Sequence, residues 1–353
     1  RDNQTARGSI CVDGEISVAS ASGQGGNILL EAKDINLSEN ANLLATGPTE
    51  GGNILVGGYW QGGASAANRV YQDSNRLMQA TKVSMHAKGG SRSGNGGLIE
   101  TSGHYLDSQN VKGSAAAEKG LAGLWLFDPT NVTIGSSGSS AGTSNNGVST
   151  ITASSISSLL NGGSSVKVTT GTSGPDLGDI SINTAITKSS GSEVTLTFVA
   201  ANSIVVNESI THTGGSALNL IFDADNSSTT GTTRNGGGLT ILEKSISSGG
   251  GTITFGGSAS GSYTGGNLYV GGGSSAISIL SSGGAISVKG QLIVANSNAS
   301  GLTINSSNGN ISVSKEIDSG NSYTAISGNR TWEEALADAD NVSNSFLATI
   351  TSA

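Results

Sequence analysis

The chain has 353 residues, of which 55 are glycine, while only 12% are charged and 4% are aromatic. An α-rich or doubly wound enzyme needs amphipathic helices and about twice this share of charged residues, so the composition argues against both classes. The net charge of −8 includes no cluster of basic residues, and we therefore expect no nucleic-acid partner.

From the N-terminus, the first clear elements are short strands that follow glycine doublets. Residues 25–30 read GGNILL, residues 51–56 read GGNILV, and a variant, GGLIE, occupies residues 96–100. The alternating apolar positions predict strands, and the doublets predict turns. Between the second and third strand, residues 57–85 contain Tyr59, Trp60 and Tyr71. We expect them to leave the repeating part as a polar and aromatic excursion.

Residues 154–160 are predicted to form one helical turn before a strand at residues 166–169. Residues 223–235 are predicted to form a second, polar excursion. The glycine phrase then returns at residues 237–242, 250–255, 265–270 and 283–288, and alternation without the doublet marks residues 276–280 and 302–305. Near the C-terminus, Thr331 is predicted to cap a short amphipathic helix that runs to Ala339, with Glu334 completing a capping box.

Short strands with this spacing fit a β-sandwich, a propeller or a parallel solenoid. Hairpin turns of the Asn-Gly or Asp-Gly kind are few, and no period of about 40 residues marks propeller blades. Because 35% of the residues are hydrophobic, we expect a folded chain rather than a disordered one. We predict an all-β fold, a right-handed parallel β-helix with loop excursions and a short α-helix near the C-terminus. At roughly 20 residues per coil, about 17 coils would form a rod on the order of 80 Å long.

Several phrases, in the same order, resemble one protein family. Residues 120–134 (GLAGLWLFDPTNVTI) are the most specific, and residues 51–62, 91–103, 178–182 and 196–204 add further phrases. Together they resemble the filamentous-haemagglutinin-like exoproteins, the large secreted partners of two-partner secretion systems in Gram-negative bacteria. The resemblance implies a right-handed β-helix, export through an outer-membrane partner transporter, and an adhesive role. We expect Trp125 to pack in a coil and Asp128 and Pro129 to turn the chain out of it.

The resemblance divides the chain into a β-helix over residues 1–325 and a second unit over residues 326–353. Residues 329–339 (NRTWEEALADA) and 346–352 (FLATITS) resemble the opening of a C-type-lectin-like domain. The calcium and sugar ligands of such domains would follow Ala353, so no ligand residue is assigned. The alternative is a helical cap that closes the rod. We expect the sequence to be part of a longer chain.

Residue types that bind metals or carry catalysis are scattered along the sequence. His86, His104 and His212 have no cysteine or acidic partner at ligand spacing, and Cys11 is the only cysteine. We therefore predict no metal site, no catalytic triad and no internal disulfide, and we assign no catalytic or cofactor-binding residue.

The strongest enzymatic alternative comes from the fold, because parallel β-helices also include enzymes that cleave polysaccharides with paired carboxylates. Asp176 with Asp179, and Asp223 with Asp225, are the candidate pairs. Both pairs lie beside glycine or polar turns, where acidic residues also occur for local structural reasons. A calcium loop that begins at Asp223 fails, because its sixth and twelfth positions lack the required Gly and Glu.

Two further features admit a binding or a structural interpretation. Tyr59, Trp60 and Tyr71 could stack on a sugar ring or pack over the rod. Glycosylation sequons are frequent in a chain rich in Asn, Ser and Thr, and modification remains open at Asn36, Asn131, Asn207, Asn226, Asn298, Asn310 and Asn341.

The sequence thus predicts a non-enzymatic adhesin segment, secreted or held at the surface of a Gram-negative bacterium, in which a rigid stalk displays an adhesive element. The expected partners are surface glycans or proteins of a host or neighbouring cell, and the outer-membrane transporter during export. The alternatives are a polysaccharide-cleaving enzyme and a structural subunit of a self-associating surface fibre.

Overall fold

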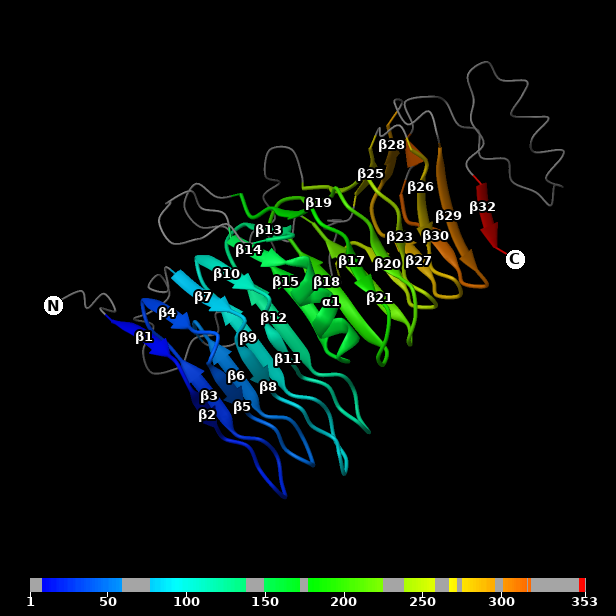
Figure 1. Cartoon of the computed structure of the whole chain (residues 1–353). Helices are drawn as coiled ribbons and strands as arrows, with labels where there is room; N and C mark the ends of the chain where they lie inside the picture. Colours follow the sequence, from blue (N-terminus) through cyan, green and yellow to red (C-terminus); the bar gives the residue numbers. More distant parts are fainter. Residues whose placement is uncertain are drawn as a thin grey trace, which may run out of the picture.

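The computed structural model describes residues 8–58, 77–137, 149–171, 177–224, 238–257, 267–271, 275–295, 301–315, 317–318 and 349–352. In these residues the chain forms 32 β-strands and one α-helix, and the strands stack in long parallel sheets. The chain winds along a rod with its two ends at opposite ends of the rod (Figure 1). The predicted all-β parallel β-helix is confirmed. No helix in the described part is long and apolar enough to cross a membrane.

Three faces run along the rod. The first face is a twelve-stranded sheet, here in spatial order: β1 (Ser9–Val12), β4 (Asp34–Leu37), β7 (Leu77–Thr81), β10 (Tyr105–Gln109), β14 (Ser149–Thr152), β13 (Val132–Gly135), β16 (Ile180–Ile182), β19 (Ile204–Val206), β22 (Thr240–Leu242), β25 (Leu268–Val270), β28 (Leu292–Val294) and β31 (Ile317–Asp318). The second face is a ten-stranded sheet: β3 (Asn27–Leu30), β6 (Asn53–Val56), β9 (Leu98–Ser102), β12 (Leu124–Asp128), β15 (Ser165–Thr169), β18 (Val194–Val199), β21 (Leu218–Asp223), β24 (Ile253–Phe255), β27 (Ile286–Val288) and β30 (Ile311–Val313).

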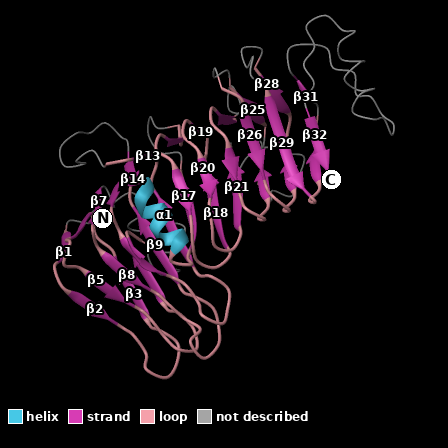
Figure 2. Cartoon of the chain, turned by 45° about the vertical axis from the view of Figure 1, so that its right-hand side comes forward, coloured by secondary structure: helices cyan, strands magenta, loops and turns pink. Residues whose placement is uncertain are grey.

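The third face changes character halfway along the rod. Its N-terminal part is a four-stranded sheet of β2 (Glu15–Ser17), β5 (Asn42–Leu44), β8 (Ser84–His86) and β11 (Lys112–Ser114). Its C-terminal part is a six-stranded sheet of β17 (Ile186–Lys188), β20 (Ile210–His212), β23 (Ile246–Ser247), β26 (Ile277–Leu280), β29 (Leu302–Ser307) and β32 (Thr349–Ser352). Helix α1 (Ala153–Asn161) packs against both β11 and β17 and joins the two parts (Figure 2).

The described chain makes eleven coils, since the third face has four strands, the helix and six strands. At about 4.8 Å between neighbouring strands the rod is about 50 Å long. The sequence estimate of about 17 coils is therefore wrong. A coil takes more residues than expected: Asn53 stacks on Asn27, 26 positions earlier, and Asn207 stacks on Asn183, 24 positions earlier.

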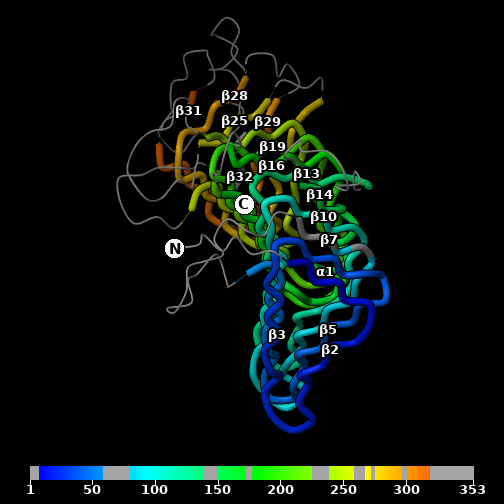
Figure 3. Tube along the Cα trace, turned by 90° about the vertical axis from the view of Figure 1, so that its left-hand side faces the viewer, coloured from blue at the N-terminus to red at the C-terminus, as the bar shows by residue number. Residues whose placement is uncertain are grey.

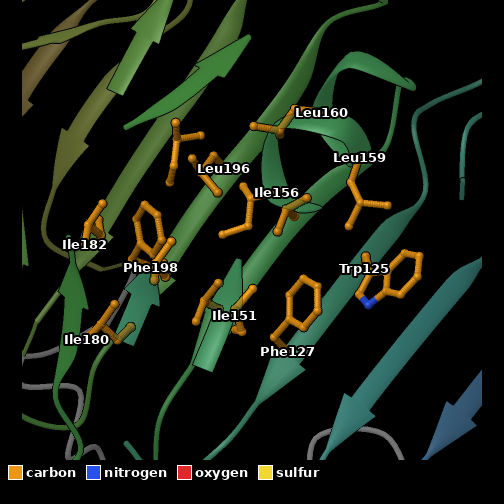
Figure 4. Packing of buried hydrophobic residues seen from close by; sticks show 14 of the residues in the cluster. Trp125, Phe127, Ile151, Ile156, Leu159, Leu160, Ile180, Ile182, Leu196 and Phe198 are labelled. Carbon is orange, nitrogen blue, oxygen red and sulfur yellow. The ribbon is translucent and has the colours of Figure 1, made fainter. Parts of the chain in front are cut away.

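The helical turn expected at residues 154–160 is confirmed as α1, and it comes with a change of strand order. The chain forms β13 first and then returns to place β14 between β10 and β13, parallel to both. The buried side chains of α1 include Ile156, Leu159 and Leu160. These side chains complete the interior on the face where a strand is missing (Figure 4).

The core consists of inward-facing columns in which each coil places one side chain above the last. One column of the ten-stranded sheet runs in register through Ile28, Ile54, Ile99, Trp125, Val166, Leu196, Leu220, Ile253, Ile286 and Ile311. In the neighbouring column Phe198, Phe222 and Phe255 stack with ring centroids 5.6 and 5.2 Å apart. Trp125 and Phe127 are fully buried and β12 ends at Asp128, as expected for the family-like phrase.

The third face turns into the ten-stranded sheet of the N-terminal half at residues 18–26, 45–52, 87–97 and 115–123, which we name the glycine corner; the first three segments end in a glycine doublet and the fourth ends in the single Gly123. Within each coil the two limbs of this corner contact through their backbones, and Gly52 N donates to Ala45 O at 2.7 Å. A Cβ on Gly52 would lie 2.0 Å from the Gly26 carbonyl oxygen. Glycine is required here because no side chain fits between stacked backbones. The corner extends the cross-section of the N-terminal coils (Figure 3).

The C-terminal unit predicted over residues 326–353 is described only at its end. The helix expected from Thr331 to Ala339 lies outside the described residues. Thr349–Ser352 forms β32, which pairs in parallel with β29 as one more strand of the third face. Residues 349–352 therefore belong to the third face, and the lectin-like start and the helical cap both remain predictions.

Candidate functional site

The corner between the ten-stranded and the twelve-stranded sheet contains the family-like phrases. Asn131 Oδ1 accepts hydrogen bonds from the backbone N–H groups of Gly178 at 2.8 Å and Asp179 at 2.7 Å. Asp179 Oδ1 in turn accepts from Asn202 Nδ2 at 2.7 Å and from Ser203 N at 3.0 Å. Three phrases far apart in sequence therefore form one ladder, in which a side chain of each coil binds the backbone of the next.

This ladder gives Asp179 a structural role. Its carboxylate accepts a side-chain amide and a backbone amide of the following coil, and its predicted partner Asp176 lies outside the described residues. Similarly, Asp223 ends β21, whereas Asp225 lies outside the described residues.

The structure instead relates Asp223 to Asp128, which the sequence did not pair with it. Thr169 donates a hydrogen bond to Asp128 Oδ1 and is in register with Val199, which is in register with Asp223. Both carboxylates thus lie in one row across the outer face of the ten-stranded sheet. Three strand spacings separate them, roughly 14 Å in all. Carboxylates that act together on one glycosidic bond are about 5–10 Å apart, so this pair does not fit that chemistry.

Two lysines lie among these acids, and together Asp128, Lys167, Asp223 and Lys289 form what we call the acid–lysine row. Burial raises the pKa of Asp128 above its ordinary value, while the Thr169 hydroxyl and Lys167 act in the opposite direction. Burial also raises the pKa of Asp223, against the opposing effects of Lys289 and Lys167 and of the Gly257 N–H. Lys289 Nζ donates to the Gly257 carbonyl at 2.6 Å. The row spreads its four charges over six coils, from β12 to β27, rather than concentrating them at one point.

The three histidines belong to three separate local arrangements. His86 Nε2 is 3.0 Å from Ser84 Oγ, and burial, with Lys88 nearby, lowers the pKa of this imidazole. His104 Nδ1 is 3.1 Å from Thr130 Oγ1. His212 Nε2 is 3.1 Å from the Ser216 carbonyl oxygen. Among the residues that the structure describes, no three His, Cys, Asp or Glu side chains converge on one point.

The other sequence-predicted binding residues divide into three groups. Tyr59, Trp60 and Tyr71 lie outside the described residues, as do the sequon residues Asn226, Asn298 and Asn341. Asn36, Asn207 and Asn310 are exposed. Asn131 is half-buried, and its side-chain oxygen is engaged in the corner ladder.

One surface feature was missed at the sequence level. Val205, Ile241, Tyr269 and Ile293 occupy the same outward position on β19, β22, β25 and β28, and are half-buried. A signal for it exists in the sequence: most of these strands are three consecutive apolar residues, as in LYV at 268–270 and LIV at 292–294. In a three-residue strand whose first and last side chains face the interior, the middle side chain must face outward.

Comparison with known proteins assigns neither a family nor a function to this chain. No protein-family model matches the chain, and no curated protein matches it.

Proposed function

We propose that this chain is the stalk of an adhesin, secreted or held at the surface of a Gram-negative bacterium. The observation that carries the proposal is the unbroken parallel register of the ten-stranded sheet from β3 to β30. Each coil buries its apolar side chains only against the next coil, so the length of the molecule grows along one axis with the number of coils. Such a rod holds a binding element at a distance from the surface that carries it.

The resemblance of residues 120–134 and of the other phrases supports the remaining parts of the proposal. The partner in export is then an outer-membrane transporter, and the partners in adhesion are glycans or proteins on a host or neighbouring cell. A rod can bind them through many weak contacts whose strengths combine by multivalency.

The geometry of the acid–lysine row disfavours the enzymatic alternative. A hydrolase or lyase needs its carboxylates on either side of one bond, whereas Asp128 and Asp223 are separated by the width of three strand spacings. Their elevated pKa values follow from burial, which the neighbouring lysines oppose, and do not by themselves indicate catalysis.

A bead-attachment assay tests the proposal. Cys11 is exposed on β1, so a maleimide bead can hold the protein by one end, and a Cys11→Ser variant with a C-terminal cysteine reverses the orientation. We expect beads to attach to epithelial monolayers more often than albumin-coated beads, and pectin or alginate incubated with the protein to gain no new reducing or unsaturated ends. Attachment at the albumin level in both orientations would refute the adhesive function. Glycan cleavage that disappears in an Asp128→Asn, Asp223→Asn double variant would establish the enzyme instead.

A further inference from the structure

The outer face of the twelve-stranded sheet contains an apolar stretch between polar ends. In one outward row, Thr133 and Ser181 are followed by Val205, Ile241, Tyr269 and Ile293, and Asp318 ends the row. Strand spacings of about 4.8 Å make this apolar stretch roughly 14 Å long. A flat apolar strip of this kind on an otherwise polar sheet indicates a binding surface.

Tyr269 is distinct among the described aromatic residues. Trp125, Phe127, Phe198, Phe222 and Phe255 face the interior, and Tyr105, which faces outward, packs its ring against His104 at 4.5 Å. Within the described residues no ring contact and no hydrogen bond engages Tyr269. Ile241 and Ile293 lie on either side of it on the neighbouring strands, so its ring is centred on the apolar strip.

Polar side chains with unused hydrogen-bonding groups lie next to this ring. Asn267 precedes it by two residues and uses only its Oδ1, which accepts from Gln291 N at 2.9 Å. The side chains of Gln291 and Glu243 make no hydrogen bond or ion pair within the described part. The Glu243 carboxylate occupies the space where a side chain would project from Gly271, two residues after Tyr269, because a Cβ there would lie 2.0 Å from Oε1.

Several outward amides elsewhere on the rod donate a hydrogen bond to a side chain of the preceding coil. Asn53 donates to Asn27 at 2.7 Å, Asn207 to Asn183 at 2.8 Å, and Asn219 to Glu193 at 2.9 Å. Asn267 binds the backbone of the next coil as Asn131 does, but its Nδ2 group, the Gln291 amide and the Glu243 carboxylate retain hydrogen-bonding capacity for a ligand.

We propose that Tyr269, flanked by Ile241 and Ile293 and by the polar groups of Asn267, Gln291 and Glu243, is a saccharide-binding platform. The ring and the two isoleucines present a flat apolar surface to the C–H face of a pyranose, while the amides and the carboxylate reach its hydroxyl groups. This inference deepens the proposed adhesive function and rests on it.

Charge narrows the class of saccharide. The one charged side chain of the platform is the Glu243 carboxylate, and the whole chain carries a net charge of −8. A uronic-acid polymer would be repelled, so the platform suits a neutral glycan or one built from amino sugars.

Isothermal titration calorimetry with cellotetraose, tetra-N-acetylchitotetraose and tetragalacturonate tests the platform. We expect one of the two uncharged probes to bind and tetragalacturonate not to bind. Tyr269→Ala should weaken binding about tenfold or more, and Tyr269→Phe, which keeps the ring, should retain most of it. Ser181→Ala, in the same outward row on β16, is the matched control and should bind as wild type does. Equal thermal midpoints among these variants would exclude unfolding as the cause.

Three results would overturn the assignment. The first is no heat of binding with either uncharged probe. The second is undiminished binding by the Tyr269→Ala variant. The third is self-association in sedimentation velocity that Tyr269→Ala abolishes, because the strip would then be an interface between two copies. Bead attachment to cells that survives Tyr269→Ala would refute the platform and leave the adhesive stalk standing, so the two proposals fail separately.

Discussion

Trp125 offers the sharpest test of the solenoid interior, because it lies in the most specific phrase of the sequence, residues 120–134, and its side chain is part of the core. Its side chain is fully buried, and its ring extends to Gly113 on β11, where an added Cβ would lie 2.9 Å from the ring. Trp125→Ala should lower the free energy of unfolding by about 3–5 kcal/mol, the range for truncation of a buried large aromatic side chain. Trp125→Asp should cost more, since it also buries a carboxylate with no cationic partner.

Urea denaturation followed by far-ultraviolet circular dichroism measures the effect. The matched control is Leu121→Asp, which introduces the same carboxylate four residues earlier at a side chain that is 75% exposed. We expect this control to change stability by no more than about 0.5 kcal/mol. The comparison separates burial at Trp125 from a general effect of added negative charge.

Equal urea midpoints for Trp125→Asp and Leu121→Asp would refute the reasoning. The LWLFD strand would then lie on the surface, and the phrase that resembles the exoprotein family would have no part in the core.

Three further predictions address the corners, the charges and the modularity of the rod. Gly52→Ala should destabilise the folded protein by about 1–3 kcal/mol in the same urea assay, because the added Cβ would meet backbone atoms. Gly14→Ala is the control and should not destabilise it, because the space around Gly14 is open. Equal effects of the two substitutions would contradict the close packing of the glycine corner. Burial raises the folded-state pKa of Asp128, so the charged form of this carboxyl is disfavoured in the folded protein at neutral pH. Asp128→Asn should therefore be at least as stable as wild type at pH 7 and lose that advantage as the pH falls toward 3.8, the ordinary pKa of the group. A stability advantage of the variant that grows on acidification would reverse the assigned direction of the pKa shift. Deletion of residues 180–203 removes one whole coil and brings β19 into register with β13. Circular dichroism should therefore still show a cooperative β-rich fold, whereas a deletion of half that length should abolish it. Loss of the fold in both deletion variants would contradict a modular solenoid.

The repeating part of this fold could be predicted from sequence because its physical causes are local. Alternation of apolar residues places Ile28 and Ile54 inside and their neighbours outside. A glycine doublet marks three of the four glycine corners in which two backbones touch. The burial of Trp125 follows from the same alternation, since large apolar residues at inward positions have no other place to go.

Other features depend on contacts between coils and could not be predicted from the order of residues in the sequence. Lys188 occupies an inward position in β17, where alternation alone would call for an apolar residue, and its ammonium group is satisfied by the carbonyl oxygens of Ser190 at 2.7 Å and Gly191 at 3.4 Å. The return of the chain to insert β14 before β13 depends on pairing with β10, a strand about 40 residues away in sequence.

The candidate sites show the same division. The Asp-Pro-Thr-Asn phrase was recognisable, but its role depends on Asn131 meeting Gly178, which is 47 positions later. Likewise, Asp223 was singled out with a sequence neighbour, whereas the structure relates it to Asp128 through two intervening strands. Tyr269 carries no motif at all, and only the register of β22, β25 and β28 shows that it lies between two outward isoleucines.

The two halves of the rod also bear on the alternative of a self-associating fibre. In the N-terminal coils the glycine corner takes eight to eleven residues between the third face and the ten-stranded sheet, whereas the corresponding connections after β17 take three to five. Each glycine corner is hydrogen-bonded to the next one, as in Ser20 N to Thr46 O at 2.8 Å. A fibre built by stacking the last described coil of one copy on the first coil of another would leave the backbone groups of that first corner without the matching corner they pair with elsewhere. The change of cross-section therefore disfavours direct stacking of the last described coil on the first described coil, and it places the glycine corner and the proposed saccharide-binding platform at different positions along the rod.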